Sequence, residues 1–332
     1  MGIKNLTLLV KNLAPNAINE KKLGDYSGKV AAIDTSLFMY KYEYNNGDHL
    51  DGLTRQILKL MKYGITPLYI FDGYPPEEKN DTLELRNKRR ENLNIQLEDV
   101  KNKIINCNNN NEIAELETQK DKIMKRLVHI TDKHVELSKK LFDLFGVPYI
   151  EADGEAEILC ANLSYRGLVD LCITEDSDIL ANNGKILVRN FKPSKNIITE
   201  YDLDIILEDM NITYEQFVDI CIMLGCDYCP KIYGIGHVNA LKLIKKHNNL
   251  ENIIKMSSIK IPEKFDYQSA RNIFISQDDT NYTFNLNKPN SINIVSFLDE
   301  NSEKLHEKYK KEIILKLDKY YNNIINLNNN NE

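Results

Sequence analysis

The segment 146–178 constrains the fold of this chain more than any other, because it predicts a strand, a helix and a second strand in succession. Val147 to Ile150 is an apolar run of strand length, and a second run, with β-branched residues, extends from Leu168 to Ile173. Between them, Ala156 to Tyr165 has helical composition and is followed by Gly167. In a parallel βαβ unit the carboxyl ends of both strands face one crevice, where open α/β sheets bind ligands. The segment therefore predicts a parallel α/β sheet.

Four acidic residues lie at the ends of these predicted elements. Glu155 and Glu157 fall in the first turn of the helix, where both can lean over the helix end and where the dipole favours negative charge. Asp176 and Asp178 follow the second strand, so alternation can direct both to the same side. Taken alone, each pair is also explained as solvated turn residues. Together they predict that four carboxylates converge at one edge of the sheet.

Two earlier strands also end in an acid. The segment KVAAID, 29–34, reads as a short buried strand ending at Asp34, and ITPLYIFD, 65–72, ends at Asp72. Between them, residues 50–63 have apolar side chains at helical spacing. A pocket with this many carboxylates is stable only when cations bind in it. Hard oxygen ligands without a histidine favour Mg²⁺ or Mn²⁺ over zinc, so we expect a divalent metal site.

The remaining segments are predominantly helical. Residues 77–140 are rich in helix formers and charge but are interrupted by an asparagine run, so we expect two helices with a flexible tip inserted between strands. Residues 185–200 predict a strand or hairpin, and 214–224 predict an apolar helix. The asparagine-rich C-terminal tail has low complexity, and we expect it to be disordered.

A glycine-containing turn precedes a further helix that begins at HVNALKLIKKH. Gly234 and Gly236 allow backbone N–H groups to approach an anion at the helix N-terminus, with lysines just beyond. Cys226 and Cys229 could instead form half of a zinc site with His237, but no second CxxC is present.

The distribution of charge along the chain indicates whether nucleic acid is a binding partner. The formal net charge of −6 argues against nucleic acid, but from Lys120 to Lys140 basic residues outnumber acids, and from Lys231 to Leu250 there are lysines and no acid. Each run is also explained as a solvated helix face. The chain has no apolar run of membrane-spanning length and an N-terminus too short and polar for a signal peptide, so we expect an intracellular protein with reduced cysteines.

With these features in place, the chain closely resembles the flap endonucleases of the structure-specific 5′ nuclease superfamily, of the XPG/Rad2 type. The matching segments are MGIKNL, AIDTS, YIFDGYPPEEK, GVPYIEADGEAE, ITEDSD and FVDICIMLGCDYCPKIYGIGHVNALKLIKKH. They span nearly the whole chain in the family's order. The resemblance implies a mostly parallel central sheet with helices on both faces, a helical arch over the active site and a helix-two-turn-helix element. The asparagine-rich tracts are associated with A+T-rich genomes, including those of large DNA viruses.

The resemblance also assigns roles to residues. The metal-binding carboxylates would be Asp34, Asp72, Glu155, Glu157, Asp176, Asp178 and Asp227. The first four would hold one Mg²⁺ and the last three a second, and Mn²⁺ would substitute for either. Lys79 and Arg86 would lean from the arch onto the scissile phosphate and act as catalytic residues together with Asp34 and Asp176. The substrate-binding residues would be Gly2, Tyr40, Gly234, Gly236 and Lys242. Of these, Tyr40 would stack on a nucleotide, and Gly234 and Gly236 would bind a duplex phosphate together with a K⁺ ion.

The expected parts follow the same resemblance. They are an N-terminal nuclease half at 1–78, a helical arch at 79–140, an internal nuclease half at 141–228, the helix-two-turn-helix and C-terminal helices at 229–325, and a disordered tail at 326–332. We expect a monomer that cleaves flapped or branched DNA in replication and repair, without a membrane, in the nucleus or at a cytoplasmic site of DNA replication. A sliding-clamp box would be ILKLDKYY at 314–321, but it lacks the leading Gln and its apolar spacing favours a packed terminal helix.

Several alternatives stay open at this point. The spacer between Asp34 and Asp72 is short, and it is where the family builds its wedge and its pocket for a one-nucleotide 3′ flap. An exonuclease or a junction-resolving nuclease of the same superfamily therefore remains an alternative to a flap endonuclease. A nuclease of structured RNA is another, since the carboxylates act on the phosphate. A non-catalytic DNA-binding scaffold would require missing carboxylates, and none is missing.

Overall fold

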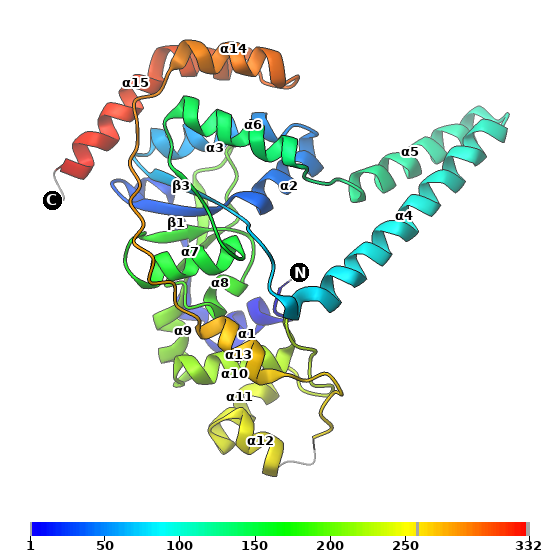
Figure 1. The fold of residues 1–332 in the computed structure, drawn as a ribbon, viewed down its shortest axis with the longest axis vertical. Helices are drawn as coiled ribbons and strands as arrows, with labels where there is room; N and C mark the ends of the chain where they lie inside the picture. Colours follow the sequence, from blue (N-terminus) through cyan, green and yellow to red (C-terminus); the bar gives the residue numbers. More distant parts are fainter. Residues whose placement is uncertain (1, 257–258, 330–332) are drawn as a thin grey trace.

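The computed structural model describes residues 2–256 and 259–329, and within them a seven-stranded mixed sheet forms the centre of the molecule (Figure 1). The strands are β1 (Ile18–Lys22), β2 (Val30–Asp34), β3 (Thr66–Phe71), β4 (Tyr149–Glu151), β5 (Leu171–Ile173), β6 (Ile186–Arg189) and β7 (Ile197–Asp202), in the order β1-β7-β6-β5-β2-β3-β4. The five strands from β6 to β4 run parallel, whereas β7 is antiparallel to both β6 and β1. The mostly parallel sheet is confirmed, and β6 and β7 form the expected hairpin.

Helices cover both faces of the sheet, and each face has its own apolar core. The core on one face includes residues of α1 (Leu6–Leu13), α7 (Ala156–Tyr165), α8 (Asp178–Ala181), α9 (Leu203–Met210), α10 (Tyr214–Leu224), α11 (His237–His247), α12 (Leu250–Met256) and α13 (Tyr267–Ile275). The other packs against α2 (Thr35–Asn46), α3 (His49–Lys62), α6 (Asp132–Phe145), α14 (Ser291–Asn301) and α15 (Glu307–Asn329). Short 3₁₀ helices lie at Pro15–Ala17, Leu23–Tyr26 and Glu77–Lys79.

The helices form where the sequence supplies an apolar stripe and a cap. In α3 the predicted stripe of Leu53, Ile57 and Leu60 is fully buried, and the Asp48 side chain caps the first turn. α10 begins with a capping box between Thr213 and Gln216. The bounds of α7 and α10 coincide with the predicted ones.

The strands on either side of α7 are shorter at their N-terminal ends than predicted. β4 begins at Tyr149 and not at Val147, because Pro148 has no N–H and only its carbonyl joins the ladder, accepting from Tyr69. β5 begins at Leu171 because the N–H groups of Leu168 and Val169 turn back to the carbonyl of Leu163 and close the end of α7. Both strands still point the same way and end at the same edge of the sheet.

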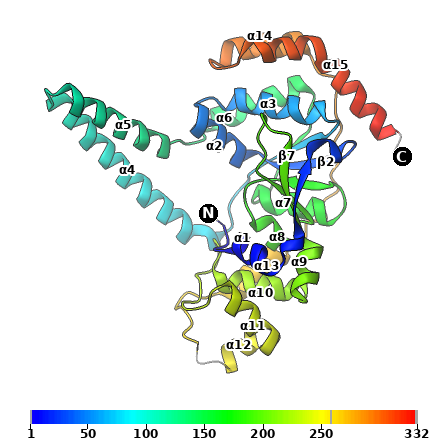
Figure 2. The same ribbon diagram turned by 180° about the vertical axis from the view of Figure 1, so that it is seen from behind.

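The expected pair of long helices forms a hairpin that extends away from the body (Figures 1 and 2). It consists of α4 (Asn80–Asn106) and α5 (Asn110–Arg126), with the asparagine run at the turn between them. A small apolar core of Leu93, Val100 and Ile123 holds the two helices together. α4 starts beside the N-terminus of the chain, and α5 returns on the side of α2 and α6 (Figures 1 and 2). The hairpin therefore has two separate attachments to the body.

The C-terminal third is divided between the two faces. α11 to α13 pack on one core, and an extended segment then leads to α14 and α15 at the opposite end (Figure 1). The segment 314–321 lies inside α15 with Leu317 and Tyr320 buried, as expected for a packed terminal helix. The expected disordered tail is wrong for residues 326–329, which continue α15 because Ile324 still anchors this helix on the core; residues 330–332 lie outside the described part. No helix in the described residues is long and apolar enough to cross a membrane.

Candidate active site

Three aspartates occupy the carboxyl ends of three adjacent parallel strands. Asp34 is the last residue of β2, and Asp72 directly follows β3. Asp176 lies just beyond β5, on the other side of β2. Because β2 pairs with both β3 and β5 in parallel, the three carboxylates are neighbours along one edge of the sheet. The predicted convergence of strand ends is confirmed.

Asp34 is held firmly at the centre of this edge. Its Oδ1 accepts a hydrogen bond from the N–H of Leu37, as the cap of α2, and its Oδ2 lies 3.2 Å from the hydroxyl of Thr174. The side chain is buried. Burial, and then the negative charges of Asp72 and Asp176, raise the pKa of Asp34 to about 7. This carboxylate is therefore kept in place but is costly to ionise without a nearby cation.

The N-terminus of α7 brings Glu155 and Glu157 to the same edge. Glu155 is the N-cap residue and is 8% exposed, and Glu157 follows in the first turn. The Oδ1 of Asp72 accepts from the N–H of Ala156 at 2.8 Å, which fixes the helix end to the end of β3. Burial, followed by the charges of Asp176 and Asp178, raises the pKa of Glu157 well above its ordinary value.

The N-terminal segment of the chain closes the site against Asp176 and Asp178. The Oδ1 of Asp178 accepts from the N–H of Ile3 at 2.7 Å, and the Oδ1 of Asp176 accepts from the N–H of Asp178 at 3.1 Å. Gly2 has a φ of +87°, and a Cβ on it would lie 2.5 Å from the Oδ1 of Asp176. Only glycine fits there. Burial, and then Asp176, raise the pKa of Asp178 well above its ordinary value.

Two basic side chains from the base of the α4–α5 hairpin reach into the carboxylates. Lys79, 9% exposed, donates from Nζ to the Oε1 of Glu155 and lies 3.5 Å from the Oδ2 of Asp227. Arg86 donates to the same Oδ2 of Asp227 at 2.7 Å. The hydroxyl of Tyr228 donates to the Oε2 of Glu155. The base of the hairpin is therefore linked to the acidic cluster at Glu155 and at Asp227.

Seven carboxylates thus lie in one connected cluster, and burial, together with the charges of neighbouring carboxylates, raises the pKa values of three of them, Asp34, Glu157 and Asp178. An all-oxygen donor set with this much negative charge fits divalent cations of the Mg²⁺ class. Elsewhere in the described residues, Glu43, His49 and His134 form a group of three potential ligands whose atoms all lie within 4.8 Å of one another.

The other predicted site residues lie on α2, in the turn before α11 and on α11 itself. Tyr40 is 43% exposed on α2 and stacks on Tyr44, with ring centroids 6.2 Å apart. Gly234 has a φ of +81° in the turn before α11, and Gly236 is the N-cap residue of α11. A Cβ on either glycine would meet no atom within 4 Å, so the turn is open to an approaching ligand. Lys242 is exposed on α11.

The alternative zinc site is not formed. The Nε2 of His237 pairs with the amide of Asn12 at 3.0 Å. Burial raises the pKa of both Cys226 and Cys229 to about 12, so both are protonated thiols. Within the described residues these side chains make no close group of three ligands with His237.

Sequence reasoning missed three contributors to the site. The hydroxyl of Thr174 donates to Asp34 and accepts from the N–H of Asp176 at 3.1 Å. The hydroxyl of Tyr228 donates to Glu155, and the N–H of Ile3 donates to Asp178. Ile3, Thr174 and Tyr228 lie within the matching segments MGIKNL, ITEDSD and FVDICIMLGCDYCPKIYGIGHVNALKLIKKH, and this resemblance was the only available signal. Their roles depend on contacts with residues far away in the chain.

The chain matches two family models, described as the XPG N-terminal domain over residues 1–93 and the XPG I-region over residues 146–227. It is 38% identical over 298 residues to flap endonuclease 1 of Salmo salar, covering 84% of this chain and 76% of that one. Flap endonuclease 1 of Entamoeba dispar is 37% identical, with 85% and 78% covered.

Solved structures agree with these matches. The flap endonuclease-1 of Methanococcus jannaschii superposes with a TM-score of 0.67 at 27% identity, covering 93% of this chain and 96% of that one. The catalytic core of Rad2 in complex with a DNA substrate gives a TM-score of 0.71 at 23% identity, covering 95% and 100%, and this likeness concerns the fold.

Proposed function

Because this chain belongs to the XPG family, among the flap endonucleases of the XPG/Rad2 type, we propose that it is a structure-specific 5′ flap endonuclease. It would also be a 5′–3′ exonuclease and would act on DNA in replication and repair. The observation that carries the proposal is the cluster of carboxylates at the strand ends, with Lys79 and Arg86 reaching into it from the hairpin. A hydrolase that cleaves phosphodiesters needs this pairing of cation-binding oxygens with phosphate-binding cations.

The residues present fit two divalent cations. Asp34, Asp72, Glu155 and Glu157 would hold one Mg²⁺ and Asp176, Asp178 and Asp227 the other, with Mn²⁺ able to substitute. When bound, such ions supply an activated water and neutralise the phosphate and leaving oxygens. The ammonium of Lys79 contacts Glu155, and a cation held by Glu155 would compete with it for this carboxylate.

Lys79 and Arg86 are proposed to exchange one anionic partner for another. Both contact the Oδ2 of Asp227, which is 17% exposed, so both lie where a phosphodiester would meet the cluster. An arriving phosphate competes with Asp227 for the guanidinium of Arg86 through the same charge-assisted hydrogen bonds. Turning toward the phosphate would orient the scissile bond and free Asp227 for a cation.

DNA would contact the protein on both sides of this cluster. Tyr40 offers an exposed ring for stacking on a base at the junction. The turn with Gly234 and Gly236 would bind a duplex phosphate, with a K⁺ ion and Lys242 adding positive charge. The Rad2 core was solved with a DNA substrate, and a flapped or branched DNA is the partner proposed here. The protein would act as a monomer in the nucleus or at a cytoplasmic replication site; no clamp contact is proposed.

A junction-resolving or exonuclease specificity is the second candidate. The observation that favours it is the short connection between α2 and α3, in which α2 ends at Asn46 and α3 begins at His49. Nothing of the wedge expected for a double-flap enzyme fits into the two intervening residues. The nuclease chemistry would be the same, and only the preferred DNA would differ.

The test is cleavage with Mg²⁺ of three end-labelled DNAs: a single 5′ flap, a double flap with one 3′ nucleotide, and a four-way junction. Cutting at the base of the flaps supports the proposal, and stimulation by the 3′ nucleotide would mean that other residues form the pocket. Preference for the junction would establish the second candidate. Binding of all three DNAs without cleavage would leave a DNA-binding scaffold and overturn both.

A further inference from the structure

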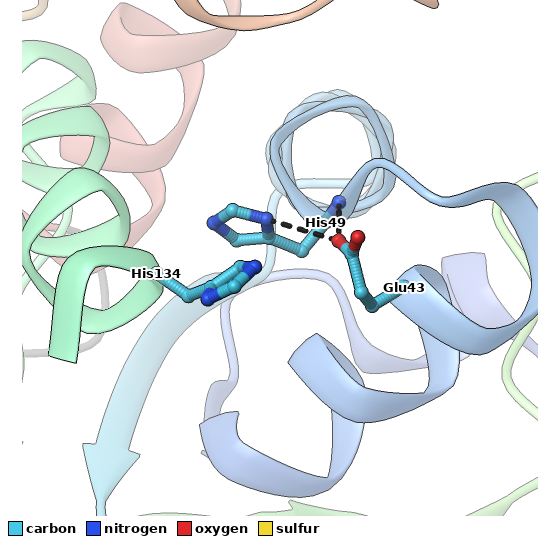
Figure 3. A group of neighbouring side chains, drawn as sticks. All are labelled: Glu43, His49 and His134. Atoms are coloured by element: carbon cyan, nitrogen blue, oxygen red, sulfur yellow. Dashed lines mark hydrogen bonds and ion pairs between the residues drawn. The ribbon is translucent and has the colours of Figure 1, made fainter. Parts of the chain in front are cut away.

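Three potential metal ligands from three helices meet outside the carboxylate cluster (Figure 3). Glu43 lies near the C-terminal end of α2, His49 is the first residue of α3, and His134 lies in the first turn of α6. One ligand atom from each lies within 4.8 Å of the other two. Figure 3 shows the carboxylate of Glu43 directed at His49, with the ring of His134 beside that of His49.

The spacing of Glu43 and His49 is that of two ligands on one ion. The Nδ1 of His49 lies 3.3 Å from the Oε2 of Glu43, which is long for a hydrogen bond. Two atoms bound at about 2.0–2.1 Å in a tetrahedral arrangement are about 3.3–3.4 Å apart. The backbone N–H of His49 also donates to this Oε2, at 3.0 Å, and so fixes the carboxylate in place. The pair is already at the distance that a shared ion requires.

His49 has no satisfactory arrangement by itself. It is 6% exposed, and its Nε2 is buried without a hydrogen-bond partner. In the tautomer protonated on Nδ1, the lone pair of Nε2 is buried without a hydrogen-bond donor. In the tautomer protonated on Nε2, the lone pair of Nδ1 faces the Glu43 carboxylate, and the two repel each other. A cation between Nδ1 and the carboxylate turns this repulsion into two coordinate bonds, and the Nε2–H keeps no acceptor in that state.

His134 can supply the third bond. Its Nδ1 accepts from the backbone N–H of Thr131 at 3.1 Å and lies 2.6 Å from the Thr131 hydroxyl, so the neutral ring carries its proton on Nε2. Binding a metal through Nε2 requires this proton to move to Nδ1, which would then donate to the Thr131 hydroxyl in place of the bond from the backbone N–H. A ligating histidine commonly donates its second ring nitrogen to an outer oxygen in this way. The rings of His134 and His49 have centroids 4.8 Å apart and planes at 61°, so they meet edge to face, and one ligand atom of each lies within 4.8 Å of the other.

We propose that Glu43, His49 and His134 bind one divalent transition-metal ion of the Zn²⁺ class. Two imidazoles and one carboxylate are a donor set that suits zinc and disfavours Mg²⁺. These side chains line a cavity of about 420 Å³, together with Lys133 and Glu303, which leaves room for water as a fourth ligand. The ion would tie the end of α2 and the start of α3 to α6, the helix that follows the α4–α5 hairpin.

Such an ion would set the position at which the hairpin returns to the body. α2 also bears the exposed Tyr40, one turn from Glu43. The site would therefore stiffen the surface next to the proposed DNA junction without contributing to hydrolysis. Its role is a positioning one, and its test needs a readout other than cleavage.

The experiment is metal binding by the full-length protein, stripped with a chelator and kept in millimolar Mg²⁺ so that the carboxylate cluster is occupied. Equilibrium dialysis with Zn²⁺ is expected to show one tightly retained ion, and Co²⁺ in its place is expected to give the visible absorption of a four- or five-coordinate site with nitrogen ligands. His134→Ala is expected to lower Zn²⁺ affinity by about a hundredfold or more and to abolish the Co²⁺ spectrum. His129→Ala, which removes an exposed histidine nearby, is the matched control and is expected to retain both.

Two further variants make the result decisive. Glu43→Gln keeps the side-chain size and removes the charge, and it is expected to weaken Zn²⁺ binding even where His134→Ala folds poorly. Asp176→Ala is expected to leave the Zn²⁺ ion and the Co²⁺ spectrum unchanged. The proposal is overturned if Zn²⁺ binding is lost in Asp176→Ala and kept in His134→Ala, if a thiolate charge-transfer band places the ion on cysteine, or if no Zn²⁺ is retained.

Discussion

The backbone of Gly2 lies against the carboxylate of Asp176 so closely that a Cβ at Gly2 would fall 2.5 Å from its Oδ1. The same Cβ would lie 2.7 Å from the Oδ1 of Asp178. The backbone of Gly2 thus packs tightly against both carboxylates, and the N–H of the next residue, Ile3, also holds the Asp178 oxygen. The start of the chain is therefore part of the candidate active site.

Gly2→Ala is expected to reduce cleavage at least tenfold, because the added methyl group and the positive φ displace Asp176 and Asp178 from the positions needed for a cation. Cleavage rates at several Mg²⁺ concentrations, with a thermal melt, measure the effect. Gly24→Ala is the control: its Cβ would be 3.7 Å from the Tyr63 ring, an ordinary contact. Equal rates for the two variants would show that Gly2 does not support the site.

Asp176→Ala is expected to abolish cleavage, by about 1,000-fold or more, while the fold and most DNA binding remain. The substitution removes negative charge needed for a cation and no apolar contact of the core. Single-turnover cleavage and a DNA-binding titration separate the two effects. Asp204→Ala, at an acid whose side chain is 70% exposed in an ion pair with Lys185, is the control and should cleave normally. Wild-type cleavage by Asp176→Ala would refute the assignment of the site.

Arg86→Ala is expected to slow the chemical step by about 10- to 100-fold and to weaken DNA binding less, because the guanidinium acts on one phosphate at the cluster. Its single-turnover rate at saturating enzyme and its dissociation constant for a flap should be compared with those of Lys103→Ala. The Lys103 side chain is 60% exposed in a surface ion pair on the same helix. A large loss of affinity with an unchanged rate would mean that Arg86 only positions the duplex.

Tyr228→Phe is expected to destabilise the fold by about 1 kcal/mol and to raise the Mg²⁺ concentration needed for cleavage several-fold, with recovery at high Mg²⁺. The reason is that Glu155 loses the donor that fixes its Oε2. Tyr282→Phe loses a comparable hydroxyl bond, to Asp278, at 2.6 Å, outside the site, so only its stability should change. If both variants showed the same Mg²⁺ dependence, the hydroxyl of Tyr228 would have no part in cation binding.

Stability without divalent ions is expected to fall as pH rises through about 7. The pKa of Asp34 is raised from an ordinary 3.8 to about 7, by burial and by Asp72 and Asp176, and those of Glu157 and Asp178 are raised too. Between the unfolded and folded pKa values the folded state binds more protons, so the free energy of unfolding decreases with increasing pH. Melting temperatures at pH 6 and pH 8 in chelator should differ by about 3 °C or more, with pH 6 higher, and Mg²⁺ should reverse the loss at pH 8. A higher melting temperature at pH 8 in chelator would contradict the raised pKa values.

Local patterns in the sequence were enough to predict most of the architecture. The burial of Leu53, Ile57 and Leu60, the bounds of α7 and α10, and the aspartates at the ends of β2, β3 and β5 follow from side-chain periodicity and from strand ends. Because parallel strands share one carboxyl edge, the convergence of the acids followed as well. The starts of β4 and β5 did not follow from periodicity, since Pro148 and the closing turn after α7 decide where each strand joins the ladder.

The sequence by itself thus determined a parallel α/β nuclease fold and which carboxylates gather at its edge. Only the tertiary structure decided which groups hold these carboxylates in place. The hydrogen bonds from Ile3 to Asp178, from Lys79 to Glu155 and from Arg86 to Asp227 join residues that are 175, 76 and 141 positions apart, respectively. It also decided that Glu43, His49 and His134 meet from three helices. The physical reason is that periodicity reports only on which face of its own element a side chain lies, whereas a contact between distant elements depends on how all of them pack together.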